Sequence, residues 1–292
     1  MAHIIGVGIA ALDIINSTDG YPVEDTKIRA VAHSVRRGGN TANTLSVLSQ
    51  LGHQCSWCGT LGDDAGSEVI KQDLRKYHID ISYSKRVKDG HSPTSYITLN
   101  QENGSRTIVH YRDLPEYAYA DFISHDFSSV DWIHLEGRNI EETASILRFL
   151  SANYPAVSIS LEVEKSHAGI EKLFPLVHLL FFSRQYALDS GYDNAKFFLT
   201  DMTNKYKQLI MVCSWGEQGA CAVDVDTQIY CSPAVPMEKV VDTIGAGDTF
   251  HAGFIDARIR GCTIVQSLNR ACFLASKKCS QYGFDDLTLS ES

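Results

Sequence analysis

Residues 240–254 read Val-Val-Asp-Thr-Ile-Gly-Ala-Gly-Asp-Thr-Phe-His-Ala-Gly-Phe, and this stretch decides how the rest of the chain is interpreted. The β-branched pair at 240–241 is expected to end an apolar strand, and the glycines that follow predict a turn. Beyond the turn, small and aromatic residues recur at helical spacing. The stretch therefore predicts a strand, a glycine turn and the start of a helix, in that order.

The predicted turn has the chemistry of an anion-binding site. Gly245 and Gly247, on either side of Ala246, allow a ligand to approach the backbone closely. The first N–H groups of the helix lack intrahelical partners, and the helix dipole also attracts negative charge. Asp248 is unexpected there, because a carboxylate repels phosphate. It fits either as a helix cap or as a general base, and the short Gly-x-Gly-Asp core alone favours the cap.

The whole segment Asp242-Thr243-Ile244-Gly245-Ala246-Gly247-Asp248 resembles the signature of the ribokinase-like carbohydrate kinases. The resemblance implies that Asp248 is the catalytic base and that the amides of Gly245, Ala246 and Gly247 stabilise the transferring phosphoryl group. It also implies ATP and Mg²⁺ as cofactors. With the family in view, catalysis becomes the favoured role of Asp248.

The length and net charge of the chain limit the classes of protein to which it can belong. The chain has 292 residues, 44% of them hydrophobic, and no Pro/Gly/Ser-rich linker, so we expect a single domain over 1–292. The net charge is −9 and no run of Lys or Arg exceeds a pair, which argues against a nucleic acid or a membrane surface as partner. No stretch approaches the roughly 18 apolar residues of a spanning helix and no signal sequence is evident. We expect a cytoplasmic protein.

The eight cysteines are scattered, at positions 55, 58, 213, 221, 231, 262, 272 and 279. Most lie in apolar stretches, which predicts buried reduced thiols in place of a disulfide framework. The pair at 55 and 58 has no matching second pair, so we do not expect a zinc site there.

From residue 130 onward, apolar strands alternate with helical patterns. Such alternation predicts βαβ units and a parallel sheet between two layers of helices, an α/β/α sandwich. An additional apolar strand is expected at 3–12. The later strands are expected at 132–135, 157–163, 179–182 and 209–213, with helices at 141–153 and near 195–206.

Two segments, at about 14–37 and 82–112, break this pattern because they read as extended chain. The second contains a predicted hairpin of strands 95–99 and 106–111. We expect both segments to form a small antiparallel sheet that covers the sugar end of the site as a lid. One face of that sheet would be apolar, which predicts a homodimer through the lids.

Polar residues near the predicted lid indicate a sugar site. Asp13 is expected at the end of the first strand, where ligands of α/β sheets bind. Gly39, Asn40 and Asn43 open a predicted helix at 41–51, and asparagine amides both donate to and accept from sugar hydroxyls. Helix capping accounts for one of the two asparagines but not for both. The resemblance adds Arg106 to the predicted sugar-binding residues.

Candidate nucleotide and metal residues lie in the second half of the chain. In the family, a glycine turn at the position of Gly216 and Gly219 holds the nucleotide, although these residues alone predict only a turn. Many family members have a glutamate that organises Mg²⁺ after the strand at 179–182, where this chain has Ser-Arg-Gln-Tyr. Arg184 could contact a nucleotide phosphate directly. Glu162 and Glu164 could hold Mg²⁺ through water, or one of them could pair with a neighbouring lysine.

Further motifs narrow the resemblance to the branch of the family that phosphorylates ketohexoses: Arg37–Asn40, His134–Asn139, Ser160–Lys165, Lys277–Cys279 and Gly283–Asp285. This branch implies transfer of phosphate from ATP to the 1-hydroxyl of fructose or a similar ketohexose. Two alternatives remain: a kinase for another sugar or a nucleoside, and a catalytically silent sugar or nucleotide sensor on the same scaffold. The intact turn with Asp248 argues against the sensor.

Overall fold

The computed structural model describes residues 1–288, and at its centre lies an eight-stranded sheet. Six neighbouring strands are parallel, and the two at one edge form an antiparallel hairpin. The inner strands are buried along nearly their whole length, as a sheet covered on both faces requires. Across the sheet the order is β14 (Ile229–Ser232), β13 (Ala220–Val223), β12 (Ile210–Ser214), β11 (Leu179–Phe182), β10 (Ser158–Val163), β9 (Trp132–Glu136), β1 (His3–Val7) and β4 (Gln54–Cys58).

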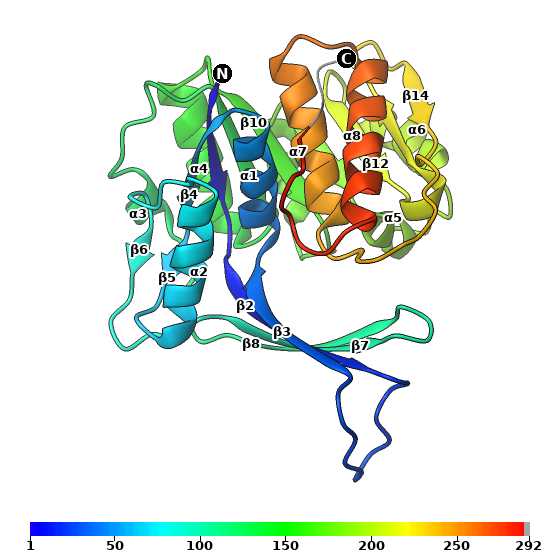
Figure 1. The fold of residues 1–292 in the computed structure, drawn as a ribbon. Helices are drawn as coiled ribbons and strands as arrows, with labels where there is room; N and C mark the ends of the chain where they lie inside the picture. Colours follow the sequence, from blue (N-terminus) through cyan, green and yellow to red (C-terminus); the bar gives the residue numbers. More distant parts are fainter. Residues whose placement is uncertain (289–292) are drawn as a thin grey trace.

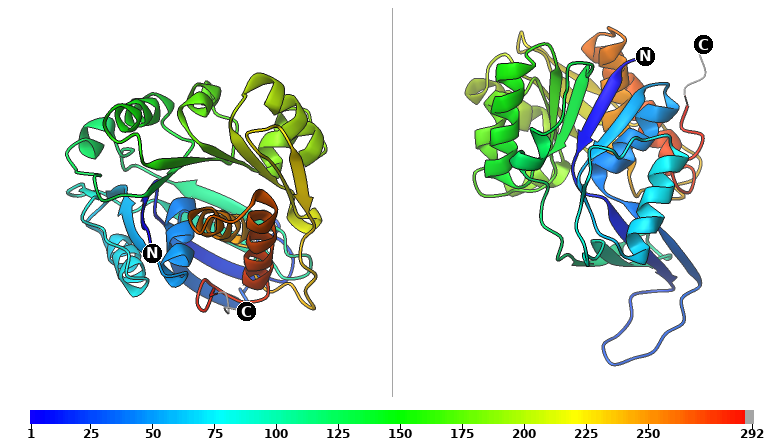
Figure 2. Two further views of the ribbon diagram at one scale, coloured as in Figure 1. Left: turned by 90° about the horizontal axis from the view of Figure 1, so that it is seen from above. Right: turned by 90° about the vertical axis from the view of Figure 1, so that its left-hand side faces the viewer.

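Helices cover both faces of this sheet (Figures 1 and 2), and each layer closes its own apolar core. The predicted α/β/α sandwich is therefore confirmed. One layer contains α1 (Asn40–Gln50), α2 (Ala65–Lys76), α7 (Ala246–Ile259) and α8 (Ile264–Cys279). The other contains α3 (Tyr119–Phe122), α4 (Ile140–Asn153), the 3₁₀ helix η1 (Ile170–Leu176), α5 (Arg184–Asp189) and α6 (Ala195–Lys205). Among residues 1–288, no helix combines the length and the apolar character needed to cross a bilayer.

A separate four-stranded sheet, called the lid below, lies at one end of the main sheet (Figure 1). Its strands are β3 (Ala32–Gly38), β2 (Ala11–Thr18), β7 (Thr94–Asn100) and β8 (Arg106–Tyr111), in that order. The expected small sheet is present, but it is mixed: β2 and β7 at its centre are parallel. The reason is that the chain returns through α1, β4 and α2 between them, and a crossover of this kind joins parallel strands. A further two-stranded ribbon pairs β5 (Thr60–Leu61) with β6 (Lys85–Arg86).

The two faces of the lid differ because side chains alternate along a strand. One face has the row Asp13, Ser95 and His110 on three neighbouring strands, and it turns toward the body of the protein. The opposite face has an apolar row that crosses all four strands and is largely exposed: Val35, Ile14, Tyr96 and Val109.

Two strand predictions are wrong. The strand expected at 3–12 is divided, because the chain leaves the main sheet at residues 8–10 and continues as β2 in the lid. Asp13 therefore lies inside β2 and not at the end of a strand of the main sheet. The pair Val240-Val241 ends no strand, since residues 233–245 are irregular and the N–H groups of Val241 and Asp242 donate to the carbonyl of Cys279.

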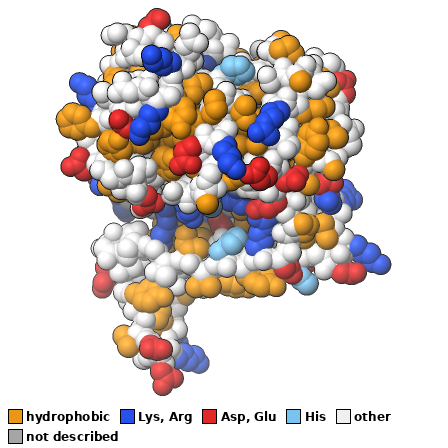
Figure 3. Space-filling view, turned by 180° about the vertical axis from the view of Figure 1, so that it is seen from behind, with side chains coloured by type: hydrophobic (Ala, Val, Ile, Leu, Met, Phe, Trp, Pro, Cys, Tyr) orange, Lys and Arg blue, Asp and Glu red, His pale blue; other side chains and the backbone are white. Residues whose placement is uncertain are grey.

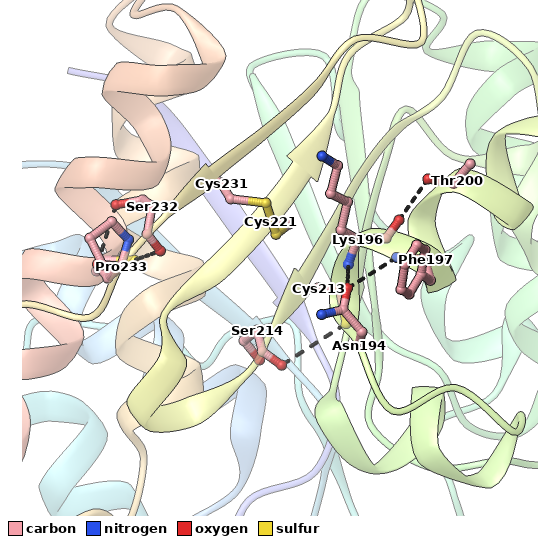
Figure 4. Close-up of a disulfide and its surroundings, with 11 residues drawn as sticks. Asn194, Lys196, Phe197, Thr200, Cys213, Ser214, Cys221, Cys231, Ser232 and Pro233 are labelled. Carbon is pink, nitrogen blue, oxygen red and sulfur yellow. Dashed lines mark hydrogen bonds between the residues drawn. A yellow bond between two sulfur atoms is a disulfide. The ribbon is translucent and has the colours of Figure 1, made fainter.

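The prediction of reduced thiols is wrong for two of the eight cysteines. Cys221 and Cys231 lie directly opposite each other on β13 and β14, with Cα atoms 4.0 Å apart, and their sulfur atoms form a disulfide (Figure 4). The hairpin register brings them together, and positions ten residues apart in sequence do not reveal that register. The other six cysteines are free thiols, four of them buried.

Candidate active site

The turn before α7 has the glycine geometry that the sequence predicts. Gly245 is the N-cap residue with φ 80°, and a Cβ atom there would lie 2.2 Å from the Phe284 ring. Both the conformation and the close ring therefore require glycine. The N–H of Ala246 donates to the carbonyl of Thr243 at 3.2 Å. Within residues 1–288, no acceptor is found for the N–H groups of Gly247 and Asp248, so these two amides are available to an anion.

Asp242, the first residue of the motif, holds this turn in place. Its carboxylate lies 2.8 Å from Lys278 Nζ and 3.0 Å from a guanidinium nitrogen of Arg36, and it accepts the N–H of Ile244. Lys278 also donates to the Asp242 carbonyl. Burial alone would raise the pKa of Asp242, but the Lys278 hydrogen bond and the charge of Arg36 outweigh it and hold this pKa below its usual value. Asp242 therefore anchors the turn as a carboxylate.

Asp248 is the third residue of α7 and is buried. Its carboxylate accepts a 2.7 Å hydrogen bond from Asn43 Nδ2 and makes no capping bond to the helix. Burial raises the pKa of Asp248 to about 7, against the lowering effect of the Asn43 hydrogen bond, and the negative charges of Glu164 and Glu136 add to the rise. A carboxyl group with this pKa is suited to proton exchange near neutral pH.

Arg37 fixes the orientation of Asn43. The buried guanidinium donates to Asn43 Oδ1 at 2.8 Å, and its other nitrogens contact Asp73 at 2.5 Å and Ser46 at 2.8 Å. Because Asn43 Oδ1 is occupied by a donor, its NH₂ group faces Asp248. Sequence reasoning missed this role of Arg37 and expected Asn43 to serve the sugar.

A cavity of about 450 Å³ lies between the lid and the body, and Figure 3 shows this hollow with Lys, Arg and His side chains at its edge. It is called the acceptor cavity below. The residues predicted for the sugar all line it: Asp13, Gly39, Asn40, Asn43 and Arg106. Asp248 lines the same cavity, so the structure brings the predicted sugar residues and the predicted base together.

The lid side of the acceptor cavity depends on two glycines. A Cβ atom at Gly38 would lie 2.3 Å from Asp13 Oδ2, so glycine leaves space for that carboxylate. Gly39 has φ 107°, and a Cβ atom there would meet the Ile9 carbonyl at 2.1 Å. Burial raises the pKa of Asp13, although Ser95 and the charges of Arg36 and Arg37 oppose this rise. Ser95 Oγ lies 3.1 Å from His110 Nδ1, and both line the cavity.

A second cavity, of about 510 Å³, has a more apolar lining that includes Met237, Val240 and Phe250. The residues predicted for the nucleotide, Gly216, Gly219 and Gly247, line it. Both cavities share Arg106, Ser214, Thr243 and Gly247, so they meet at the start of α7. Arg184 lines neither: it lies over the Trp215 ring at 5.6 Å and 3.3 Å from Glu217.

Comparison with known proteins identifies the family of this chain. Residues 1–290 match the pfkB family of carbohydrate kinases. The chain belongs to this family. Its sequence is 37% identical to ketohexokinase from Mus musculus over 98% of each chain, which places it in the ketohexokinase branch. In fold it is similar to Arabidopsis thaliana ribokinase complexed with ribose and ATP (TM-score 0.79, 18% identity, 97% and 94% of the two chains) and to Cryptococcus neoformans ribokinase in complex with ADP (0.78, 16%, 97% and 95%).

This carbohydrate kinase uses ATP, and the end of β10 offers carboxylates for a divalent cation. Asn40 Nδ2 donates to Glu162 Oε1 at 2.9 Å and to Glu164 Oε2 at 3.0 Å, which holds the two side chains together. Glu164 is exposed to the acceptor cavity, whereas Glu162 is buried, and burial raises its pKa well above the usual value. Because Mg²⁺ commonly binds through one or two carboxylates together with phosphates and water, an exposed oxygen donor here fits the ion.

Glu136 is another residue of the kinase whose role the sequence did not reveal. Its Oε1 accepts the N–H of Ile9 at 3.2 Å and that of Thr41 at 3.1 Å, and its Oε2 pairs with Arg138 at 2.8 Å. It thereby joins the point where the chain leaves the main sheet to the start of α1. The ketohexokinase-like motif at 134–139 contained this residue, but only the fold shows what it holds.

Proposed function

We propose that this kinase transfers the γ-phosphoryl group of ATP to the 1-hydroxyl of fructose or a similar ketohexose. The observation that carries the proposal is the position of Asp248, buried at the cavity shared by the predicted sugar residues and beside the unpaired amides of α7. The similarity to Mus musculus ketohexokinase over nearly the whole chain supports a ketohexose as the acceptor. The choice of the 1-hydroxyl rests on that similarity.

In the proposed mechanism, Asp248 accepts the proton of the attacking hydroxyl at its carboxylate. The N–H groups of Gly247 and Asp248 donate to the oxygens of the transferring phosphoryl group, where negative charge spreads in the transition state. Arg106, which lines both cavities, adds a positive charge on the lid side. Glu164, with Glu162 behind it, would hold Mg²⁺ through water, and this ion supplies neutralisation of the phosphate charge.

The acceptor would be held from both sides. Asp13 on the lid accepts hydrogen bonds from sugar hydroxyls, and Gly39 allows the backbone to approach them. Asn40 lies opposite, at the start of α1. We propose that the main role of Asn43 is to position Asp248, and that sugar binding is secondary, because its NH₂ group already donates to that carboxylate. Gly216 and Gly219 would contact the nucleotide, and Arg184 would reach a phosphate only by leaving Trp215 and Glu217.

We also propose that residues 1–292 form one domain, with lid segments at about 14–37 and 82–112, and that two copies associate through their lids. The apolar row Val35, Ile14, Tyr96 and Val109 lies on the face that turns away from the body. Tyr96 is 53% exposed and Val109 65%. An apolar sheet face of this kind needs a cover, and a second lid offers a matching one.

A coupled ADP-release assay over ketoses, aldoses and nucleosides tests the function. We expect turnover with a ketohexose, and NMR of the product should place phosphorus coupling at carbon 1. Coupling at carbon 6 would reassign the attacked hydroxyl, and preference for another sugar or a nucleoside would leave only the family activity. Binding of sugar and ATP without any ADP release would favour the sensor.

A further inference from the structure

Three buried side chains meet beneath the acceptor cavity: His134 on β9, Glu162 on β10 and His251 on α7. Within the described part of the chain, each has one buried polar atom without a hydrogen-bond partner, namely His134 Nε2, Glu162 Oε2 and His251 Nδ1. One ligand atom from each of the three residues lies within 4.8 Å of the other two. Because a buried polar group without a partner is destabilising, three such groups gathered in one place indicate a shared ligand.

The surroundings hold the three side chains in place. Ser160 Oγ lies 2.9 Å from His134 Nδ1, which leaves Nε2 directed at the cluster, and Trp132 Nε1 donates to the same hydroxyl at 2.8 Å. Asn40 occupies Glu162 Oε1, which leaves Oε2 for the cluster. The Phe181 ring packs against His251 with a centroid distance of 4.3 Å, so one wall of the site is apolar. A hydrogen-bonded partner on the far side of a histidine ring is the usual support of a metal-binding imidazole.

We propose that His134, Glu162 and His251 bind one divalent transition-metal ion, for which Zn²⁺ is the probe. Two imidazoles and a carboxylate form a donor set that suits zinc and similar ions. Atoms bound to one zinc ion in tetrahedral geometry are about 3.4 Å apart, so the side chains need to close by up to about 1.4 Å. Glu162 and His251 also line the acceptor cavity, which provides a path of entry and an open fourth position.

This site shares Glu162 with the proposed Mg²⁺ site but differs from it in its other donors. Mg²⁺ prefers oxygen ligands and keeps several waters, whereas two of these three donors are nitrogen atoms. A bound ion would join two neighbouring strands of the main sheet to the helix that contains Asp248. It should therefore stabilise the folded protein whichever acceptor the enzyme uses.

The test uses full-length, untagged enzyme that has been treated with EDTA, dialysed and kept free of nucleotide, since ATP also binds zinc. Isothermal titration with Zn²⁺ should show one tight site per chain, and saturating Zn²⁺ should raise the Tm. Co²⁺ in place of Zn²⁺ should give ligand-field absorption without a thiolate charge-transfer band, which separates this site from the free cysteines.

Three variants locate the ion. His251→Asn should weaken Zn²⁺ binding by at least about 100-fold and abolish the Tm rise, because loss of a ligand exceeds the 10–100-fold effect of an outer partner. Ser160→Ala should weaken binding by about 10–100-fold. His167→Asn removes an exposed histidine near Glu164 and should leave binding unchanged.

Several outcomes would overturn the proposal. Absence of tight Zn²⁺ binding to the wild type would mean that a water molecule satisfies the three atoms, and equal binding in His251→Asn and wild type would mean adventitious zinc. If His251→Asn does not fold, Ser160→Ala decides the question. An anomalous map at the zinc edge without a peak among the three residues would be equally decisive. Each of these results leaves the proposed kinase reaction untouched.

Discussion

The body and the lid are both built on a sheet, but they bury it differently. The body covers its sheet with helices on two faces, and strands such as β9 and β11 are buried at every position. The lid is covered on one face only, and all six residues of β8 are exposed. The body can therefore hold the Asp248 carboxylate in a fixed, desolvated place. The lid offers a polar face to the acceptor and leaves an apolar face for a partner.

The lid packs against α2 of the body, and polar contacts also join the two regions at the site. Arg36 on β3 pairs with Asp242 of the body, three residues before Gly245. Arg37, next along the same strand, reaches Asn43 and Asp73. The edge strand β3 is thus attached to the turn before α7 through Arg36 and to Asp248 through Arg37 and Asn43. This division of labour, with chemistry in the body and recognition in the lid, can be tested from each side.

The largest expected effect comes from the body. Asp248→Asn should lower kcat by about two to four orders of magnitude, because a positioned general base contributes that much. The amide can still accept the Asn43 hydrogen bond, so binding of fructose and ATP, measured by calorimetry, should change little. Asp224→Asn, in the β13–β14 turn, is the matched control and should keep full turnover. Near-normal kcat in Asp248→Asn would remove the base from the mechanism.

The raised pKa of Asp248 predicts an effect of pH on rate and on stability. The kcat/KM should fall about tenfold per pH unit below about 7 and level off above it, since only the carboxylate accepts a proton. The stabilising effect of the raised pKa is fully present below about pH 4 and is lost as the pH rises through about 7. Asp248→Asn should therefore gain Tm relative to wild type at pH 8 but not at pH 4. A constant Tm difference would contradict the raised pKa.

The junction between lid and body should be the next most sensitive place. Arg37→Met removes three hydrogen bonds from a buried position and leaves Asn43 free to turn. We expect a loss of about 2–3 kcal/mol in the free energy of unfolding, measured in urea, together with a lower kcat. Arg29→Met, on the exposed loop before β3, should change neither. A stability loss with unchanged kcat would show that Asn43 holds its orientation without Arg37.

The lid should affect recognition more than turnover. Asp13→Ala should raise KM for fructose by about 5- to 150-fold, the equivalent of 1–3 kcal/mol, with kcat changed much less. Asn16→Ala lies three residues along the same strand, on the opposite face, and should leave both constants unchanged. If Asp13→Ala lowers kcat as strongly as Asp248→Asn, the division between lid and body is wrong.

The smallest effect on catalysis is expected at the outer face of the lid. Val109→Asp places a charge in the proposed interface and should weaken the dimer at least about tenfold, while kcat changes by less than about twofold. Val225→Asp, which is 49% exposed in the β13–β14 turn, is the matched control. Sedimentation at several protein concentrations measures both. A wild-type protein that remains monomeric at high concentration would rule out the lid dimer.

The sequence predicted most of the body because apolar residues recur there with the period of a helix or a strand. The parallel strands from β9 to β12 and the helices α4 and α6 lie within a residue or two of their expected bounds. The turn at 245–248 was also found, since its glycines are required by backbone conformation. The strand at 240–241 was not, because β-branched residues also occur in extended chain that pairs with a helix end.

The other features that the sequence did not reveal come from contacts between residues of different elements. The path of the chain at residues 8–10 depends on Glu136, and the disulfide depends on the register of one hairpin. The assignment of Asn43 to the sugar did not anticipate Arg37, which is six residues away in sequence but occupies the amide oxygen. His134, Glu162 and His251 lie on three separate elements, and their spacing in the sequence does not indicate that they meet.

Arg106 lies at the first position of β8 and, of the described lid residues, is the one that lines both cavities. If bound nucleotide orders this guanidinium and thereby tightens sugar binding, bound sugar must tighten nucleotide binding by the same factor. The two substrates would then bind with positive cooperativity that is lost in Arg106→Ala. At a high ATP concentration, the nucleotide-bound enzyme would bind its sugar at lower sugar concentrations than the nucleotide-free enzyme does.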